Sequence, residues 1–148
     1  MRKTLQNEPP TDTVSDIEQT LTLLARTLES LQRKRHYPLE RAHYILLWVI
    51  LRHGPQTVSS LAAHLSLDNS TVTRQVAVME SSSLLERNHN PEDGRSQLLT
   101  VTHLGREKAE SMRQARIDRI ANLMTAWSEK DQNELVRLLG RLNEDLAK

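Results

Sequence analysis

The chain has 148 residues, enough for one compact domain or for one small domain with helical extensions. It contains no cysteine, which excludes disulfides, thiolate metal sites and a cysteine nucleophile, and its net charge of +1 lacks the basic bias common in nucleic-acid binders. No apolar run approaches the ~18 residues of a membrane span and the N-terminal segment is too polar for a signal peptide, so we expect a cytoplasmic protein.

The N-terminal part of the chain predicts a flexible arm followed by a long helix. Residues 1–13 include Pro9 and Pro10 and little that is apolar, which indicates an arm. Ser15 and Glu18 have capping-box spacing, so we expect the helix to begin there. Its apolar residues then recur every three or four positions and form one stripe: Ile17, Leu21, Leu24, Leu28 and Leu31.

A second helix is predicted over residues 39–53, since Pro38 disfavours helix at the preceding residue. The apolar run from Tyr44 to Leu51 indicates burial on most sides. Gly54 accepts the left-handed conformation that often ends a helix, and the proline after it cannot continue the ladder of hydrogen bonds. A short extended segment at residues 57–58 follows.

A helix-turn-helix is predicted next. Ser59 is expected to cap a short helix, and residues 66–69 form a turn in which Leu67 points back into the core. Ser70 is expected to cap a second helix that extends to Ser82. One face of this second helix is apolar and should lie inward: Val72, Val76 and Met79.

Two alternating segments, residues 84–89 and 97–101, are joined by a polar loop that contains proline and glycine. This pattern predicts a β-hairpin. A helix-turn-helix followed by a hairpin with a charged tip is the layout of a winged helix-turn-helix, which reads duplex DNA. The predicted fold class is therefore mainly α with a small β-hairpin wing.

Two more helices are predicted at the C-terminus, one capped by Thr102 and reaching about Trp127, the other capped by Ser128. The last helix has leucines at intervals of four and three: Leu135, Leu139, Leu142 and Leu146. Because hydrophobic residues make up only 37% of the chain, these stripes exceed what a small core can bury. Pairing of two copies about a two-fold axis would cover them, so we expect a homodimer; one intramolecular helical bundle is the alternative.

Residues 39–105 resemble the MarR family of bacterial winged helix-turn-helix transcription regulators. Five short pieces carry the resemblance by their order and spacing: Arg52-His53-Gly54-Pro55, Val58-Ser59-Ser60-Leu61-Ala62, Ser70-Thr71-Val72-Thr73-Arg74, Pro91-Glu92-Asp93-Gly94-Arg95, and Leu99-Thr100-Val101-Thr102 with Gly105. The resemblance implies a homodimer that binds a pseudo-palindromic operator in double-stranded DNA, a repressor role, and release by a small, often aromatic or phenolic, ligand. One departure is Ser83, where the family usually has glycine; a left-handed serine there would cost about 1 kcal/mol.

On this interpretation the chain divides into an arm (1–13), a helical dimerisation region (14–37 and 106–148) and a winged helix-turn-helix DNA-binding domain (38–105). Short polar side chains near the start of a recognition helix suit the major groove and the phosphates. An arginine side chain can form a bidentate hydrogen bond with guanine, and a glutamine side chain can pair with adenine. For each candidate residue, helix capping or plain solvent exposure is the alternative to a DNA contact. The candidate contacts in the helix-turn-helix are Ser59, Ser70, Thr71, Thr73, Arg74 and Gln75.

Arg95 is the strongest candidate in the hairpin loop, because a guanidinium at a wing tip can enter a narrow minor groove. Asp93 can orient Arg95 by a charge-assisted bond, pair with Arg87, or simply form the turn; Arg87 is itself a further candidate DNA contact. Residues 70–108 carry five cations and five anions, so DNA binding has to depend on a few placed groups.

An effector pocket is expected where the second helix meets the first and the long fifth one, since polar aromatic residues gather there; ordinary core or surface positions are the alternative. Its candidate residues are His36, Tyr37, His43, Tyr44 and Trp48. The six histidines show no metal-ligand spacing, and no cofactor or metal is expected. No catalytic motif is present, which argues against an enzyme. Two alternative functions remain. The chain could be a winged-helix module that binds another protein, or a DNA-binding regulator without an effector.

Overall fold

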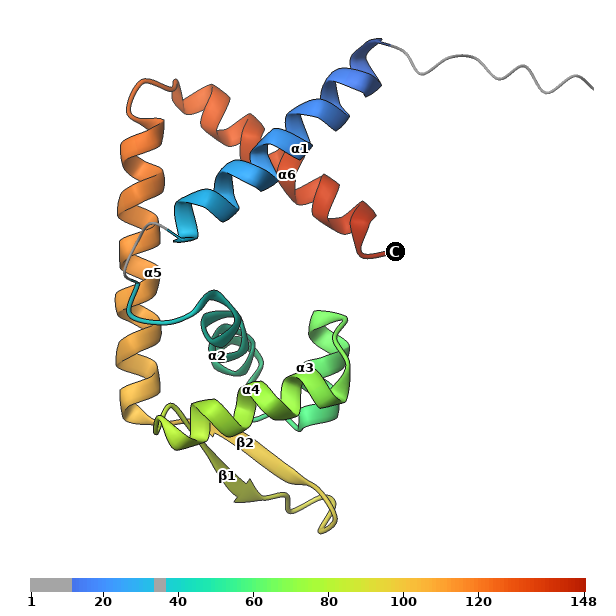
Figure 1. Cartoon of the computed structure of the whole chain (residues 1–148), viewed down its shortest axis with the longest axis vertical. Helices are drawn as coiled ribbons and strands as arrows, with labels where there is room; N and C mark the ends of the chain where they lie inside the picture. The colour runs from blue at the N-terminus through green and yellow to red at the C-terminus, as the bar shows by residue number, and fades with distance from the viewer. Residues whose placement is uncertain (1–11, 34–36) are drawn as a thin grey trace, which may run out of the picture. The chain divides into compact units, whose positions relative to one another are not determined.

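The computed structural model describes residues 12–33 and 37–148. Its elements are, in order, α1 (Asp12–Arg33), α2 (Arg41–His53), α3 (Val58–Leu65), α4 (Asn69–Ser81), β1 (Leu85–His89), β2 (Gln97–Val101), α5 (His103–Met124) and α6 (Glu129–Leu146) (Figure 1). The predicted fold class, mainly α with a small hairpin, is confirmed. The chain divides into two units, residues 1–36 and residues 37–148. None of the described helices is long and apolar enough to cross a membrane.

The first unit contains α1, which begins three residues before the predicted start. Asp12 lies in its first turn, where a carboxylate is favoured by the helix dipole. Ser15 is therefore inside the helix, and its Oγ accepts a hydrogen bond from Gln19 Nε2 at 3.4 Å instead of capping the end. The large apolar side chains described in α1 are exposed: Val14, Ile17, Leu21, Leu23, Leu24 and Leu28.

The hydrophobic core of the second unit is formed by residues between Leu39 and Met112. At its centre is α2, which packs against α3, α4, α5 and β2. This helix begins two residues later than predicted, with Glu40 as its N-cap. It ends as expected at Gly54, which has a φ of 84° and whose N–H donates to Ile50 O at 2.9 Å.

Both predicted caps of the helix-turn-helix are wrong. Thr57 caps α3, because its Oγ1 accepts the N–H of Ser60 at 3.1 Å, so Ser59 lies within the first turn. Asp68 occupies the N-cap position of α4, so Ser70 also lies inside its helix. In each case a short polar residue upstream already has the extended backbone that precedes a helix.

The predicted inward position of Leu67 is also wrong, because this side chain is 45% exposed. The preceding residue, Ser66, adopts a left-handed conformation with a φ of 52° and turns the chain away from the core. The inward stripe predicted for α4 is confirmed, since its three members are fully buried: Val72, Val76 and Met79.

The wing is an antiparallel pair in which Leu85 lies opposite Val101 and His89 opposite Gln97. A third segment extends it at Gln56, whose N–H donates to Leu99 O at 3.2 Å and whose carbonyl accepts the Leu99 N–H at 2.7 Å. The extended segment thus lies one residue before the predicted position. This pairing ties the base of the wing to the start of the helix-turn-helix.

A compact junction joins α4, the wing and α5. Ser83 has a φ of 57°, the strained conformation anticipated at this position. Thr102 caps α5 as predicted: its Oγ1 accepts the N–H of Gly105 at 2.9 Å and donates to Ser83 O at 2.6 Å. Gly105 leaves no room for a side chain, since a Cβ there would lie 2.2 Å from Leu84 O.

The first half of α5 contributes Ala109 and Met112 to the core, whereas its second half is largely exposed. The helix ends at Met124, three residues before the predicted end. Ser128 caps α6 as predicted, because its Oγ accepts the N–H of Asp131 at 3.1 Å. No residue of α6 is buried. On its surface, the hydrogen bond from Arg137 lowers the pKa of the Glu134 carboxyl.

Candidate nucleic-acid interface

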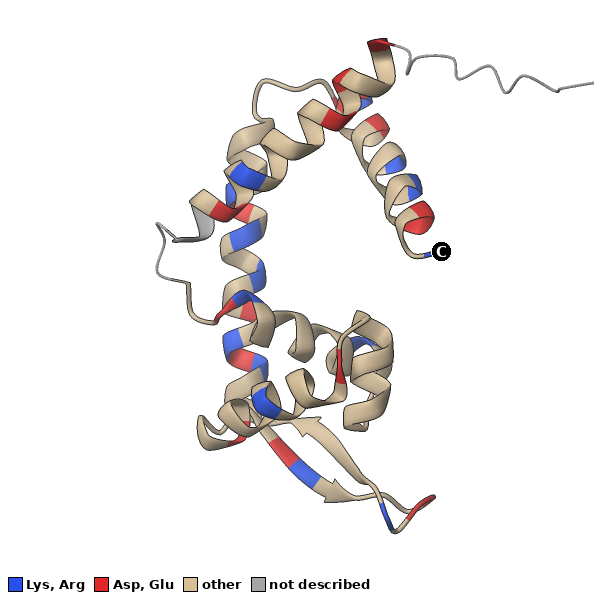
Figure 2. Ribbon diagram, turned by 45° about the vertical axis from the view of Figure 1, so that its right-hand side comes forward, with Lys and Arg blue, Asp and Glu red and all other residues tan. Residues whose placement is uncertain are grey.

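One face of α4 is buried and the opposite face is left for a partner. Arg74 and Glu80 are the charged residues of this helix, which is otherwise nearly free of charge in Figure 2. Arg74 is exposed and forms no ion pair with any residue that the structure describes. Thr71 and Gln75 lie beside it and are half-buried. This face can therefore present one free guanidinium, one amide and hydroxyl groups to a groove.

The remaining helix-turn-helix candidates lie at the surface. Ser59 and Ser70 are exposed in the first turns of α3 and α4. Thr73 is exposed too, and its hydroxyl donates to Asn69 O at 2.7 Å. That hydrogen bond uses the only proton of the hydroxyl, so Thr73 can offer a methyl group or a lone pair, but no donor, to a partner.

Arg87 has a structural partner that its sequence position did not reveal. Its Nε donates to Glu80 Oε1 at 2.8 Å, and both side chains are about two-thirds buried. The bond joins the last turns of α4 to β1, so it fixes the wing against the recognition helix. Asp93 does not pair with Arg87, and that alternative is excluded by this geometry.

The wing tip is held by a small hydrogen-bond network. Asn90 is buried, an unusual place for an amide, and its Nδ2 donates to Ser96 Oγ at 2.7 Å. Its Oδ1 accepts the N–H of Glu92 at 3.0 Å. Ser96 Oγ in turn donates to Asp93 O at 3.2 Å. Asn90 and Ser96 thus bridge the two ends of the loop, a role that the sequence reasoning missed although Asn before Pro is a turn signal.

Within this loop Asp93 acts as a turn former. Its Oδ1 accepts the backbone N–H of Arg95 at 3.0 Å, an interaction that shapes the backbone. Arg95 is exposed, and its guanidinium forms no ion pair with any side chain in the described part of the chain. Two acidic residues, Glu92 and Asp93, precede Arg95 at the tip, where Figure 2 shows one acidic and one basic segment, so the position of Arg95, rather than the net charge, makes the wing able to contact a phosphate or a groove.

The four predicted effector residues that the structure describes do not come together as one cleft. Two of them pack against α5: Arg119 donates through one Nη to the hydroxyl of Tyr37 at 3.1 Å, and the Arg116 guanidinium lies 5.6 Å from the centre of the Tyr44 ring. Arg119 thus contacts the hydroxyl of Tyr37, whereas Arg116 lies over the ring face of Tyr44. The contacts therefore link α2 and the segment before it to the second half of α5.

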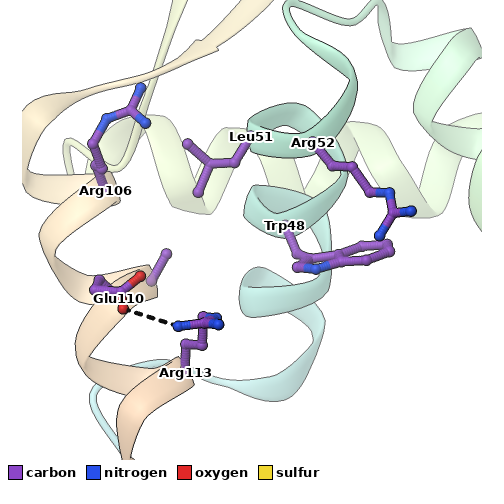
Figure 3. Close-up of a pocket in the computed structure, with 7 residues that line it drawn as sticks. Trp48, Leu51, Arg52, Arg106, Glu110 and Arg113 are labelled. Carbon is purple, nitrogen blue, oxygen red and sulfur yellow. Dashed lines mark hydrogen bonds and ion pairs between the residues drawn. The ribbon is translucent and has the colours of Figure 1, made fainter.

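Of the other three effector candidates, His36 lies outside the described residues, and His43 is buried in α2. Trp48 is 44% exposed and lines a groove between α2 and the first half of α5 (Figure 3), to which none of the other described candidates contributes. Among the residues described, no cluster of three or more metal-ligating side chains occurs.

Comparison with known proteins places this arrangement in a family. The sequence pattern of the MarR family matches residues 39–97. The uncharacterised HTH-type transcriptional regulator YxaD of Bacillus subtilis is 36% identical over 142 residues, which cover 95% of this chain and 97% of the relative. The HTH-type transcriptional repressor MdtR of Bacillus subtilis is 25% identical over 131 residues, or 87% of this chain and 84% of the relative.

Among solved structures, a MarR family protein from Bacillus stearothermophilus has a similar fold, with a TM-score of 0.82. The two chains are 24% identical, and the match covers 95% of this chain and 100% of the other. The winged helix-turn-helix, the exposed face of α4 and the ordered wing thus agree with the near full-length relationship to YxaD. The chain belongs to the MarR family of DNA-binding transcription regulators.

Proposed function

We propose that the protein is a homodimeric repressor that a small ligand releases from its operator. The observation that supports dimerisation is the apolar surface outside the core. The core ends at Met112, yet large apolar side chains continue along α1, the second half of α5 and α6. A second copy offers matching stripes, so pairing about a two-fold axis would bury them. The dimerisation region would include residues 14–37 and 106–148, and residues 38–105 would form the DNA-binding domain.

Two DNA-binding lobes in one dimer suit successive major grooves, which lie roughly 34 Å apart on one face of the duplex. In each lobe the N-terminal part of α4 would enter the major groove, with Arg74 on guanine and Gln75 on adenine. Arg95 would enter the adjacent minor groove. Hydroxyl groups would contact phosphates, from the exposed Ser59, Ser70 and Thr73 and the half-buried Thr71, and the methyl group of Thr73 could instead contact a thymine methyl.

The repressor role is supported by the name of one relative, MdtR, which is a transcriptional repressor. A ligand would act by favouring a lobe spacing that no longer matches two successive grooves, because it binds that state more tightly. The contacts of Tyr37 and Tyr44 with α5 lie between the DNA-binding core and the proposed dimerisation region, so they are positioned to respond to such a change.

The dimer is tested by Leu139→Asp, which places a charge on the apolar stripe of α6 where the leucine is 40% exposed. Light scattering after size exclusion should give a dimer for the native chain and a monomer for this variant. Arg141→Asp changes the opposite face of the same helix and should remain dimeric. In a gel shift on the promoter region beside its own gene, only the dimeric proteins should bind at low salt. A native chain that is monomeric would overturn the proposal.

A second function, docking of another protein on the winged helix, is favoured by one observation: Val78 is 51% exposed on the outer face of α4. On that interpretation the dimer would show no sequence-specific DNA binding, and Val78→Ser would abolish capture of the partner protein. In the proposed function the same substitution would leave the dimer intact and change DNA affinity only.

A further inference from the structure

The outer face of α4, opposite its buried stripe, changes chemical character along the helix. Its N-terminal half presents the exposed guanidinium of Arg74 beside the half-buried amide of Gln75, and side chains of both types form hydrogen bonds with base edges. Its C-terminal half presents Ala77 and Val78, which are both exposed, and Val78 is 51% exposed. This face therefore has a polar half and an apolar half.

The hydroxyl groups next to the apolar half are already used inside the helix. Ser81 and Ser82 each donate from Oγ to the carbonyl oxygen of Val78, at 2.8 and 2.9 Å. A serine hydroxyl has a single proton, so neither serine keeps a donor for a partner. The side chains of Ala77 and Val78 contain no polar atom. What this half of α4 offers to a base edge is therefore methyl groups rather than hydrogen-bond donors.

The acidic residue of α4 does not oppose the approach of this half to DNA. Glu80 accepts a hydrogen bond from Arg87 Nε at 2.8 Å, and both side chains are about two-thirds buried. The negative charge is therefore paired and held against β1. The C-terminal half of α4 can follow the N-terminal half into the major groove without bringing an unpaired carboxylate close to the phosphates.

The spacing of the two halves matches the spacing of bases. Arg74 and Val78 are four residues apart in one helix, so they lie about 6 Å apart along its axis. This separation is close to two base-pair steps of about 3.4 Å. Ala77 and Ser81 are small and lie one turn apart on the outer face, so the helix backbone can come close enough for a short valine side chain to touch a base. The apolar group that bases present in the major groove is the C5-methyl group of thymine.

We propose that Val78 is a specificity-determining residue, which contacts the C5-methyl group of a thymine about two base pairs from the guanine bound by Arg74. This inference rests on the proposed function, and it adds a base position beyond those assigned to Arg74 and Gln75. A base without the methyl group would place a polar edge against an apolar side chain that cannot replace the lost water. The valine therefore selects thymine at this position.

Replacement of thymine by deoxyuridine tests the contact, because it removes the methyl group and keeps the hydrogen-bonding groups of the base. The probes are two labelled fragments of the promoter region beside the protein's own gene, one made with thymine and one with deoxyuridine, and fluorescence anisotropy at one low salt concentration gives both affinities. The native dimer should bind the thymine fragment about fifteenfold more tightly, since one lost methyl contact costs about fourfold in each half-site. Val78→Ala should lower this ratio by about tenfold. Leu67→Ala, which truncates an exposed apolar side chain in the turn before α4, should leave the ratio unchanged.

Equal affinity of the native dimer for the two fragments would overturn the inference and leave DNA binding by the regulator intact. A ratio that Val78→Ala and the control variant lower equally would overturn it too, as would a ratio that Thr73→Ser lowers and Val78→Ala does not. An effect of the missing methyl groups on DNA shape would be the same for all variants, so it cannot imitate the expected result. Absence of specific binding to either fragment would overturn the proposed function, and the inference with it. Melting temperatures show that the variants are folded, and Val78→Thr, which keeps the shape of the side chain but replaces one methyl group by a hydroxyl, should lower the ratio independently.

Discussion

Gly105 offers the sharpest test of how the wing is joined to α5. It is buried in the first turn of this helix. An ideal Cβ at this position would lie 2.2 Å from Leu84 O and 2.9 Å from Val101 Cγ1. The carbonyl of Leu84 is already fixed, because it accepts the N–H of Thr102 at 3.2 Å. Gly105→Ala therefore has to push α5 away from the base of the wing.

The expected loss in the free energy of unfolding follows from the contact of the new methyl group with Leu84 O. Overpacking a methyl group against fixed atoms costs about 1–3 kcal/mol, and a backbone oxygen at this distance places the loss at the upper end. The better helix propensity of alanine offsets about 1 kcal/mol of this loss. The net loss in the free energy of unfolding is then about 2 kcal/mol, or roughly 4–8 °C in Tm for a chain of this length. Scanning calorimetry at one fixed protein concentration measures it, since the Tm of a dimer depends on concentration.

Gly140 provides the matched control. It lies inside α6, and a Cβ there would meet nothing within 4 Å. Gly140→Ala should therefore raise the free energy of unfolding by about 0.5–1 kcal/mol. If Gly105→Ala were as stable as the native chain or more stable, the close approach of α5 to Leu84 would be refuted, and with it the rigid junction between the wing and the helix.

Three further predictions concern the recognition helix and the wing. Ser83→Gly should raise the free energy of unfolding by about 1 kcal/mol in a urea titration, because Ser83 has a φ of 57°; an unchanged midpoint would contradict this conformation. A double-mutant cycle of Glu80→Ala and Arg87→Ala should give a coupling of about 0.5–1 kcal/mol, and additive effects would mean that the ion pair is absent in solution. Asn90→Ala should lower DNA affinity about tenfold and have little further effect once Arg95→Ala is present; full affinity of the single variant would show that the order of the loop is not needed.

Local patterns in the sequence predicted much of the fold correctly. The three-and-four spacing of Val72, Val76 and Met79 correctly gave the buried face of α4. Alternation and a polar loop gave both strands of the wing, and the caps Thr102 and Ser128 follow from the residue types that accept an N–H at a helix start. These features depend on neighbours in the chain, which is why they are readable without a structure.

The helix starts were harder because several short polar residues lie close together. Thr57 and Ser59 are equally good caps by type, as are Asp68 and Ser70, and the turn between the helices decides which one is used. The alternation of residue types in the two predicted strands could not reveal the bridge from Gln56 to Leu99, since this pairing joins residues far apart in sequence.

In the candidate site, too, contacts between residues on different elements could not be predicted from the sequence. Exposed positions such as Arg74 and Arg95 were identified from residue type and place in the motif. The partner of Arg87 was missed because Glu80 lies on another element, and Asn90 was missed because nothing in its neighbourhood predicts burial on a hairpin. The groove that Trp48 lines depends on the packing of α2 against α5, whose facing side chains are distant in the chain.

In the proposed function, α4 and the wing bind duplex DNA through a few placed groups. Its most direct test is the dependence of DNA affinity on salt, measured by fluorescence anisotropy with the promoter fragment for the native chain and for Arg95→Ala. We predict sequence-specific binding by the native chain and, for Arg95→Ala, weaker binding with a salt slope smaller by about one. A dimeric native protein with no specific binding at low salt would contradict this function, as would an Arg95→Ala variant whose affinity and salt slope are both unchanged.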